Sequence, residues 1–148
     1  MTVRRGLLLV IYGVGLLGLV ACGKKGPPFV PKTNPNFSVT QLTAERMDGN
    51  VGLSGRLLIH GEQSAEYRLI AGCMVYHASY EKTEPPCEGC PIHYRLLEEI
   101  KGQVIFEDRF YCEIPLSSKK GLHFYNVRLI NEDGGSGPPS DRAMLTVE

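Results

Sequence analysis

The stretch YNVRLINEDGGSGPPS, residues 125–140, carries the strongest structural signal in this chain of 148 residues. Every second residue from Tyr125 to Leu129 is apolar, and polar residues stand between them, which is the period of a β-strand with one buried face. The residues that follow are rich in Gly, Pro, Asn and Asp and predict a long turn. Alternation resumes from Ala143 to Val147. We therefore expect the chain to end in two strands joined by a long turn.

Shorter runs of the same kind occur upstream. Apolar, strand-like runs separated by turn residues begin at Phe37 and cover residues 37–42, 51–59, 67–80 and 103–114. Residues 94–101 suit either a helix or the edge of a strand. About seven short strands over about a hundred residues, with no long helix, predict an all-β sandwich over residues 37–148.

The run from Tyr125 to Asn131, followed by Gly137-Pro138-Pro139-Ser140, resembles the last hairpin of fibronectin type III domains. In that family the strand reads Tyr-x-Val-x-Ala-x-Asn and the loop ends Gly-x-Pro-Pro-Ser. The resemblance implies an immunoglobulin-like sandwich. The chain departs from the family at Gly55, where these domains have a core tryptophan, so we expect a divergent core.

The N-terminal residues 1–21 have the layout of a signal peptide. Arg4 and Arg5 precede an apolar run over residues 7–19, which is too short to span a bilayer. The run ends in Leu19-Val20-Ala21-Cys22, which resembles the lipobox of bacterial lipoproteins. The resemblance implies cleavage before Cys22, acylation of its thiol (a palmitate-type anchor) and of the new N-terminus. The alternatives are a plain signal peptide and an uncleaved anchor.

Residues 22–36 are expected to form a tether, because four prolines between residues 27 and 35 favour extended, solvated backbone. Its first residues, Cys22-Gly23-Lys24-Lys25-Gly26-Pro27, resemble the start of a small outer-membrane lipoprotein that associates with the lipopolysaccharide translocon. A generic lipoprotein spacer is the simpler interpretation of the same residues.

Four cysteines follow Cys22, namely Cys73, Cys87, Cys90 and Cys112. An even number in an extracytoplasmic domain favours disulfides, although three pairings are formally open. We favour a local Cys87–Cys90 bridge in the Pro-rich insertion and a Cys73–Cys112 bridge between strands. A redox pair at Cys87 and Cys90, or a zinc site made by all four thiolates, are the alternatives.

No catalytic signature occurs in the chain, and we expect neither an enzyme nor a cofactor or metal site. The histidines, His60, His77, His93 and His123, fall on different predicted strands without ligand spacing, so we expect them to be surface or half-buried strand residues. Removal of residues 1–21 takes away two of sixteen basic residues and no acidic one, which leaves a net charge of about −2. This charge argues against a nucleic-acid partner.

These patterns predict a lipid-anchored protein of the cell envelope that binds another envelope protein or a glycan and has no identified small-molecule substrate. Gly23, in place of the Asp that retains lipoproteins in the inner membrane, predicts an outer-membrane location facing the periplasm. The functional alternatives are an accessory factor of outer-membrane biogenesis that acts through the tether, and a thiol-redox or zinc protein.

Overall fold

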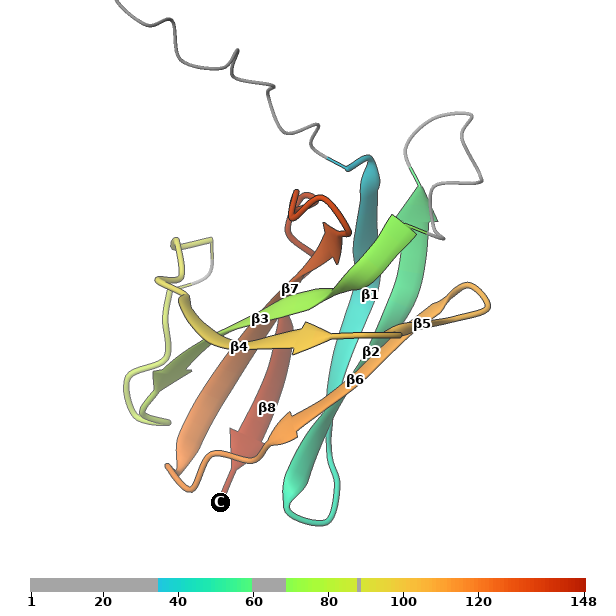
Figure 1. The fold of residues 1–148 in the computed structure, drawn as a ribbon. Coiled ribbons are helices and arrows are strands. Elements are labelled where there is room, and N and C mark those ends of the chain that lie inside the picture. Colours follow the sequence, from blue (N-terminus) through green and yellow to red (C-terminus); the bar gives the residue numbers. More distant parts are fainter. Residues whose placement is uncertain (1–34, 60–68, 88) are drawn as a thin grey trace, which may run out of the picture. The chain divides into compact units, whose positions relative to one another are not determined.

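The computed structural model describes residues 35–59, 69–87 and 89–148. Cys22, the signal sequence, most of the expected tether and His60 therefore lie outside the described residues. The regular elements of the described ranges are antiparallel β-strands in two four-stranded sheets (Figure 1). None of the described residues belongs to a helix with the length and hydrophobicity that a bilayer span requires.

The first sheet has the order β1-β2-β6-β5 and the second has the order β4-β3-β7-β8. The strands of the first sheet are β1 (Phe37–Arg46), β2 (Asn50–Ile59), β6 (Arg109–Pro115) and β5 (Ile105–Phe106). The strands of the second sheet are β4 (Arg95–Lys101), β3 (Ile70–Tyr80), β7 (Gly121–Asn131) and β8 (Ala143–Val147). The prediction of a β-sandwich is confirmed, with β5 as a two-residue addition to the seven expected strands.

Strand β7 has the two faces that the sequence predicts. Tyr125, Val127 and Leu129 are fully buried between the sheets, and Val147 of the neighbouring β8 is buried on the same side. Strand β3, which neighbours β7 in the same sheet, adds Cys73 and Val75 to the core. The opposite sheet fills the core with Phe37, Val39, Val51, Leu53, Phe110 and Ile114.

Leu129→Ala is expected to lower the free energy of unfolding by about 2–5 kcal/mol, because a fully buried leucine leaves a cavity when it is truncated. Chemical denaturation of the wild type and the variant measures the difference. Leu58→Ala is the matched control, since Leu58 is 42% exposed and its truncation should change stability by less than about 0.5 kcal/mol. Equal effects of the two changes would contradict the assignment of the core.

Gly55 shows how the core closes without the tryptophan of fibronectin type III domains. It continues the buried face of β2, and a Cβ atom built on it would lie 2.6 Å from Val39 Cγ1 and 3.0 Å from the Thr40 carbonyl oxygen. A bulge in β1 between Thr40 and Thr43 brings this strand over the glycine. Gln41 in the bulge has φ 54°, and its N–H donates to Asp141 Oδ2 at 2.8 Å. The backbone of β1 thus occupies space that a large side chain would need.

Candidate functional site

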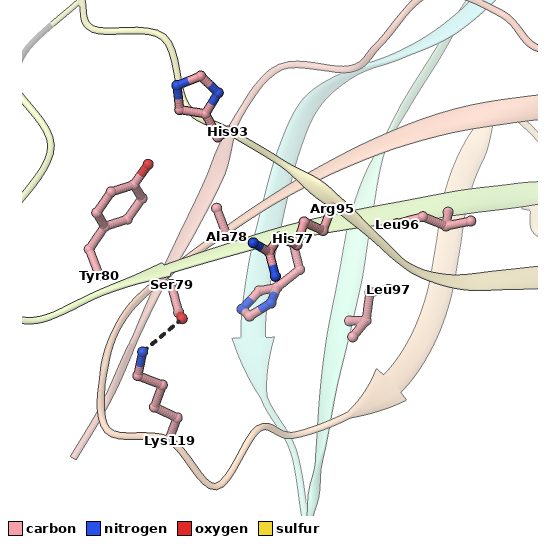
Figure 2. Close-up of a pocket in the computed structure, with 9 residues that line it drawn as sticks. All are labelled: His77, Ala78, Ser79, Tyr80, His93, Arg95, Leu96, Leu97 and Lys119. Carbon is pink, nitrogen blue, oxygen red and sulfur yellow. Dashed lines mark hydrogen bonds between the residues drawn. The ribbon is translucent and has the colours of Figure 1, made fainter.

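An open pocket of about 560 Å³ lies where β3 extends beyond the start of β4. We call it the β3–β4 pocket. It is lined by His77, Ala78, Ser79, Tyr80, His93, Arg95, Leu96, Leu97 and Lys119 (Figure 2). These residues come from two neighbouring strands, from the segment before β4 and from the loop between β6 and β7.

The pocket exists because the two strands pair over only part of their length. The last pair between β3 and β4 joins His77 to Arg95, whereas β3 continues to pair with β7 as far as Tyr80. In the same register Tyr94, His93 and Ile92 would stand opposite Ala78 to Tyr80, but these three residues precede β4 and form no such pairs. Ala78 to Tyr80 are therefore paired with β7 on one side and have no strand beside them on the side of β4.

Two histidines at this end of the sheet form a hydrogen-bonded chain. His123 is fully buried, and its Nε2 lies 2.7 Å from the carbonyl oxygen of Lys119. Because a carbonyl oxygen only accepts, Nε2 of His123 carries the proton and Nδ1 is left as the acceptor in the neutral ring. His77 Nε2 lies 2.9 Å from this Nδ1 and therefore donates to it. The geometry fixes one tautomer of both rings.

The rings also stack, with centroids 5.1 Å apart and an interplanar angle of 23°, and Tyr125 lies against His77 at the same centroid distance. Burial lowers the pKa of His77 below its ordinary value, and the neighbouring His123 and Lys119 lower the pKa further. Burial also raises the pKa of Tyr125 to about 12. A neutral His77 is thus the favoured state at neutral pH.

The free energy of unfolding is expected to fall as the pH falls below 6.5, the ordinary pKa of histidine, toward the lowered pKa of His77. In this window the unfolded chain binds a proton that the folded chain binds less well, so stability is regained as the pH rises. Urea denaturation at about pH 5 and pH 7.5 measures the difference, which His77→Gln should reduce. An unaltered difference in His77→Gln would contradict the expectation.

The charged side chains of the pocket are basic. Lys119 Nζ donates to Ser79 Oγ at 3.4 Å, and Arg95 stands opposite His77 in the sheet register. None of the described residues that line the pocket is acidic. The two ion pairs found within the described residues join Lys82 to Glu148 and Lys101 to Glu99, so neither Arg95 nor Lys119 has a carboxylate partner there.

The expectation of surface or half-buried strand histidines is wrong for His123, which is fully buried, and for His93, which precedes β4. His77 and His123 share a hydrogen bond, and His93 lines the same pocket as His77. In the register of β3 and β7, Ser79 stands opposite His123 and Tyr125 stands opposite His77, so the two histidines are diagonal neighbours on one face. The contact between His77 and His123 could have been predicted only from the register of β3 and β7, because the spacing of the two histidines along the chain does not indicate it.

The predicted cysteine pairs are brought together in different ways. Cys87 and Cys90 form a disulfide in the loop before β4, with Cα atoms 5.3 Å apart, and the Cys90 N–H donates to the Cys87 carbonyl oxygen at 3.1 Å. Cys73 of β3 and Cys112 of β6 face each other from opposite sheets as buried free thiols. A side-chain hydrogen bond between them, together with burial, raises the pKa of Cys112.

This arrangement does not assemble the four thiolates that the zinc alternative requires. Two of the sulfurs are bonded to each other in an exposed loop and the other two lie in the core. Within the described ranges no three His, Cys, Asp or Glu side chains are grouped so as to hold a metal ion. The thiol-redox alternative also lacks the helix start that lowers a cysteine pKa, since a loop surrounds Cys87 and Cys90.

The edge of the second sheet lies beside the pocket. Strand β4 pairs with β3 on one side and is the last strand of its sheet on the other. Leu96 and Leu97 in this strand are 53% and 47% exposed. The edge therefore offers unpaired backbone groups and apolar side chains next to a basic hollow.

No protein-family model and no curated protein match this chain. Among solved structures, it is similar to the third fibronectin III domain of the human KIAA0343 protein, with a TM-score of 0.52 and 13% identity over 84% of this chain and 93% of that one. A weaker similarity is to a myokine, with a TM-score of 0.42 and 10% identity over 77% of this chain and 98% of that one. Another is to pectate lyase Pel3 from Pectobacterium carotovorum, with a TM-score of 0.39 and 10% identity over 76% of this chain and 27% of that one. The chain thus has a fibronectin type III-like fold.

Proposed function

We propose that this protein is a lipid-anchored binding module of the cell envelope, which holds an envelope protein or a glycan. Two independent features support the proposal. The sequence Leu19-Val20-Ala21-Cys22 resembles a lipobox and would supply the anchor. The fibronectin type III-like sandwich is an architecture in which loops and strand edges carry binding.

The observation that carries the proposal is the face made by the β4 edge and the β3–β4 pocket. Extended segments of a partner bind a sheet edge through main-chain hydrogen bonds and gain specificity from side-chain pockets beside it. Here the exposed Leu96 and Leu97 stand on the edge strand, and Arg95 of the same strand lines the pocket. A partner that pairs with β4 would therefore contact both.

Site-specific photo-cross-linking in membranes of the native cell tests this function. A photoreactive residue at position 97 is expected to give a discrete adduct, because Leu97 is 47% exposed on the proposed face. Position 58 is the matched control, since Leu58 is 42% exposed on the opposite sheet and should give no adduct. Equal labelling from both positions would contradict the proposed binding face.

A second candidate function rests on the tether. The resemblance of residues 22–27 to the translocon-associated lipoprotein favours an accessory factor of outer-membrane biogenesis that acts through this segment. A photoreactive residue at position 32 in the same experiment separates the two functions. An adduct from position 32 with none from position 97 would favour the accessory factor.

We further expect the protein to reside in the outer membrane, facing the periplasm, because Gly23 follows Cys22 where inner-membrane lipoproteins have Asp. Sucrose-gradient fractionation should place the protein with outer-membrane markers. Gly23→Asp should shift it to the inner-membrane fractions. A wild-type protein found in the inner membrane would refute the expected location.

A further inference from the structure

We propose that the β3–β4 pocket binds a phosphate monoester, either on a free small molecule or on a lipid headgroup. This inference deepens the proposed function, because it names the chemistry of a ligand for the binding face. The pocket brings two cationic side chains, Arg95 from β4 and Lys119 from the loop after β6, to one hollow with the titratable His77 from β3 (Figure 2).

The two permanent charges of this pocket lack counter-charges. Lys119 contacts the neutral hydroxyl of Ser79, and no ion pair joins Lys119 or Arg95 to a carboxylate within the described residues. The two ion pairs found within the described residues involve Lys82 and Lys101, so what sets Arg95 and Lys119 apart from other basic side chains is that both line one pocket. An anion in the hollow would complete the hydrogen bonding of both side chains, and the planar guanidinium of Arg95 suits two oxygens of a phosphate.

His77 can supply a further hydrogen-bond donor when a bound anion favours its protonation. Its Nε2 donates to His123, and its Nδ1 makes no hydrogen bond to a described residue. His123 cannot take this role, because Lys119 and His77 already occupy both of its ring nitrogens. The groups that face His77 are His123 and Tyr125 from β7, Arg95 from β4 and Lys119 from the loop, with no carboxylate among them. An anion would offset this positive surrounding and favour protonation of Nδ1.

The number of donors selects the ligand class. A phosphate monoester carries nearly two negative charges and three terminal oxygens, whereas a carboxylate carries one charge and two oxygens. Arg95, Lys119 and a protonated His77 match the former. A volume of about 560 Å³ holds a phosphate with room for the group it esterifies, and the exposed Leu96 and Leu97 also line the pocket. An apolar part of the ligand would lie against these leucines.

The test uses the full chain in neutral detergent micelles, titrated with inorganic phosphate and, separately, with dihexanoyl phosphatidic acid. NMR signals of the His77 and His93 rings should shift saturably. Arg95→Gln and Lys119→Gln should each weaken binding by about tenfold. Lys120→Gln is the matched control: Lys120 is the next residue, it is outside this pocket, and its loss should change affinity by less than about twofold. Tighter binding of the phosphatidic acid than of inorganic phosphate assigns the headgroup as the source, and equal binding assigns the free phosphate.

Sulfate, whose charge stays constant between pH 5 and 8, tests the role of His77. Its affinity should rise as the pH is lowered, and His77→Gln should flatten this dependence. Absence of saturable shifts, or an equal loss of affinity in Lys119→Gln and Lys120→Gln, would overturn the phosphate site. Because this titration needs no anchor and no partner, its failure alongside an intact cross-link from position 97 would leave the binding module standing and remove only the phosphate ligand.

Discussion

Replacing Cys22 with alanine is expected to abolish lipid labelling and to leave an uncleaved precursor or a soluble chain. The thiol of Cys22 is the acceptor that the lipobox resemblance assigns, and no other atom of the segment can form the thioether. Each buried methylene contributes about 0.8 kcal/mol of membrane affinity, so loss of several acyl chains removes essentially the whole anchor. Metabolic labelling with radioactive palmitate, followed by membrane fractionation, measures both effects.

The control for this change is the Cys87→Ala/Cys90→Ala double variant. It also removes cysteines, but these two are joined in a disulfide and offer no thiol for acylation. Labelling should therefore be as strong as in the wild type. A Cys22→Ala variant that still incorporates palmitate and still sediments with membranes would show that the anchor is not at Cys22.

The fold was predictable where one face of a strand is buried. In β7 the core residues Tyr125, Val127 and Leu129 alternate with half-buried polar ones, and the sequence pattern alone identifies the strand. In β4 the pattern is ambiguous, because nearly every residue from Arg95 to Lys101 is exposed and only Ile100 packs against the core. An edge strand without a buried face gives no period of two, so the same residues also suit a helix.

The candidate site was less predictable because it depends on register. Nothing in the spacing of His77 and His123 along the chain indicates that they share a hydrogen bond. Their contact follows from the pairing of β3 with β7, and the pocket follows from the position at which β4 begins. Both depend on backbone pairing over long sequence separations. The bulge of β1 over Gly55 is a third such feature, since it reverses the alternation after Thr40.

Loss of a bridge between Cys73 and Cys112 is expected to have a large effect on the stability of the fold. Cys73 is fully buried and Cys112 is 5% exposed, and their thiols meet across the two sheets. We expect an oxidising envelope to join them, because the two sulfurs are already neighbours in the core. The closed loop would run from β3 to β6 and include β4 and β5. By the chain-entropy model, closing a loop of this size stabilises the fold by about 4 kcal/mol.

The chemistry of the pair dictates how to measure it. The pKa of Cys112 is raised by the hydrogen bond to Cys73 and by burial, so little thiolate forms in the folded protein. Thiolate is the reactive species in alkylation and in disulfide exchange. Both sulfurs are also buried, so a native-state thiol titration would miss them whether or not they are bonded. The protein must be unfolded in the presence of an alkylating reagent and then weighed.

Oxidised wild-type protein, unfolded without reductant, is expected to take up no label on Cys73, Cys87, Cys90 or Cys112. The Cys73→Ala/Cys112→Ala variant should lose about 4 kcal/mol of stability, and a reductant should lower the melting temperature of the wild type more than that of this variant. The Cys87→Ala/Cys90→Ala variant should lose less, because its loop is short and its segment is exposed.

Two labelled thiols in the wild type would instead establish that Cys73 and Cys112 act as a packed thiol pair. In that case the first variant would lose only the packing of two small side chains, and a reductant would affect the wild type and this variant alike.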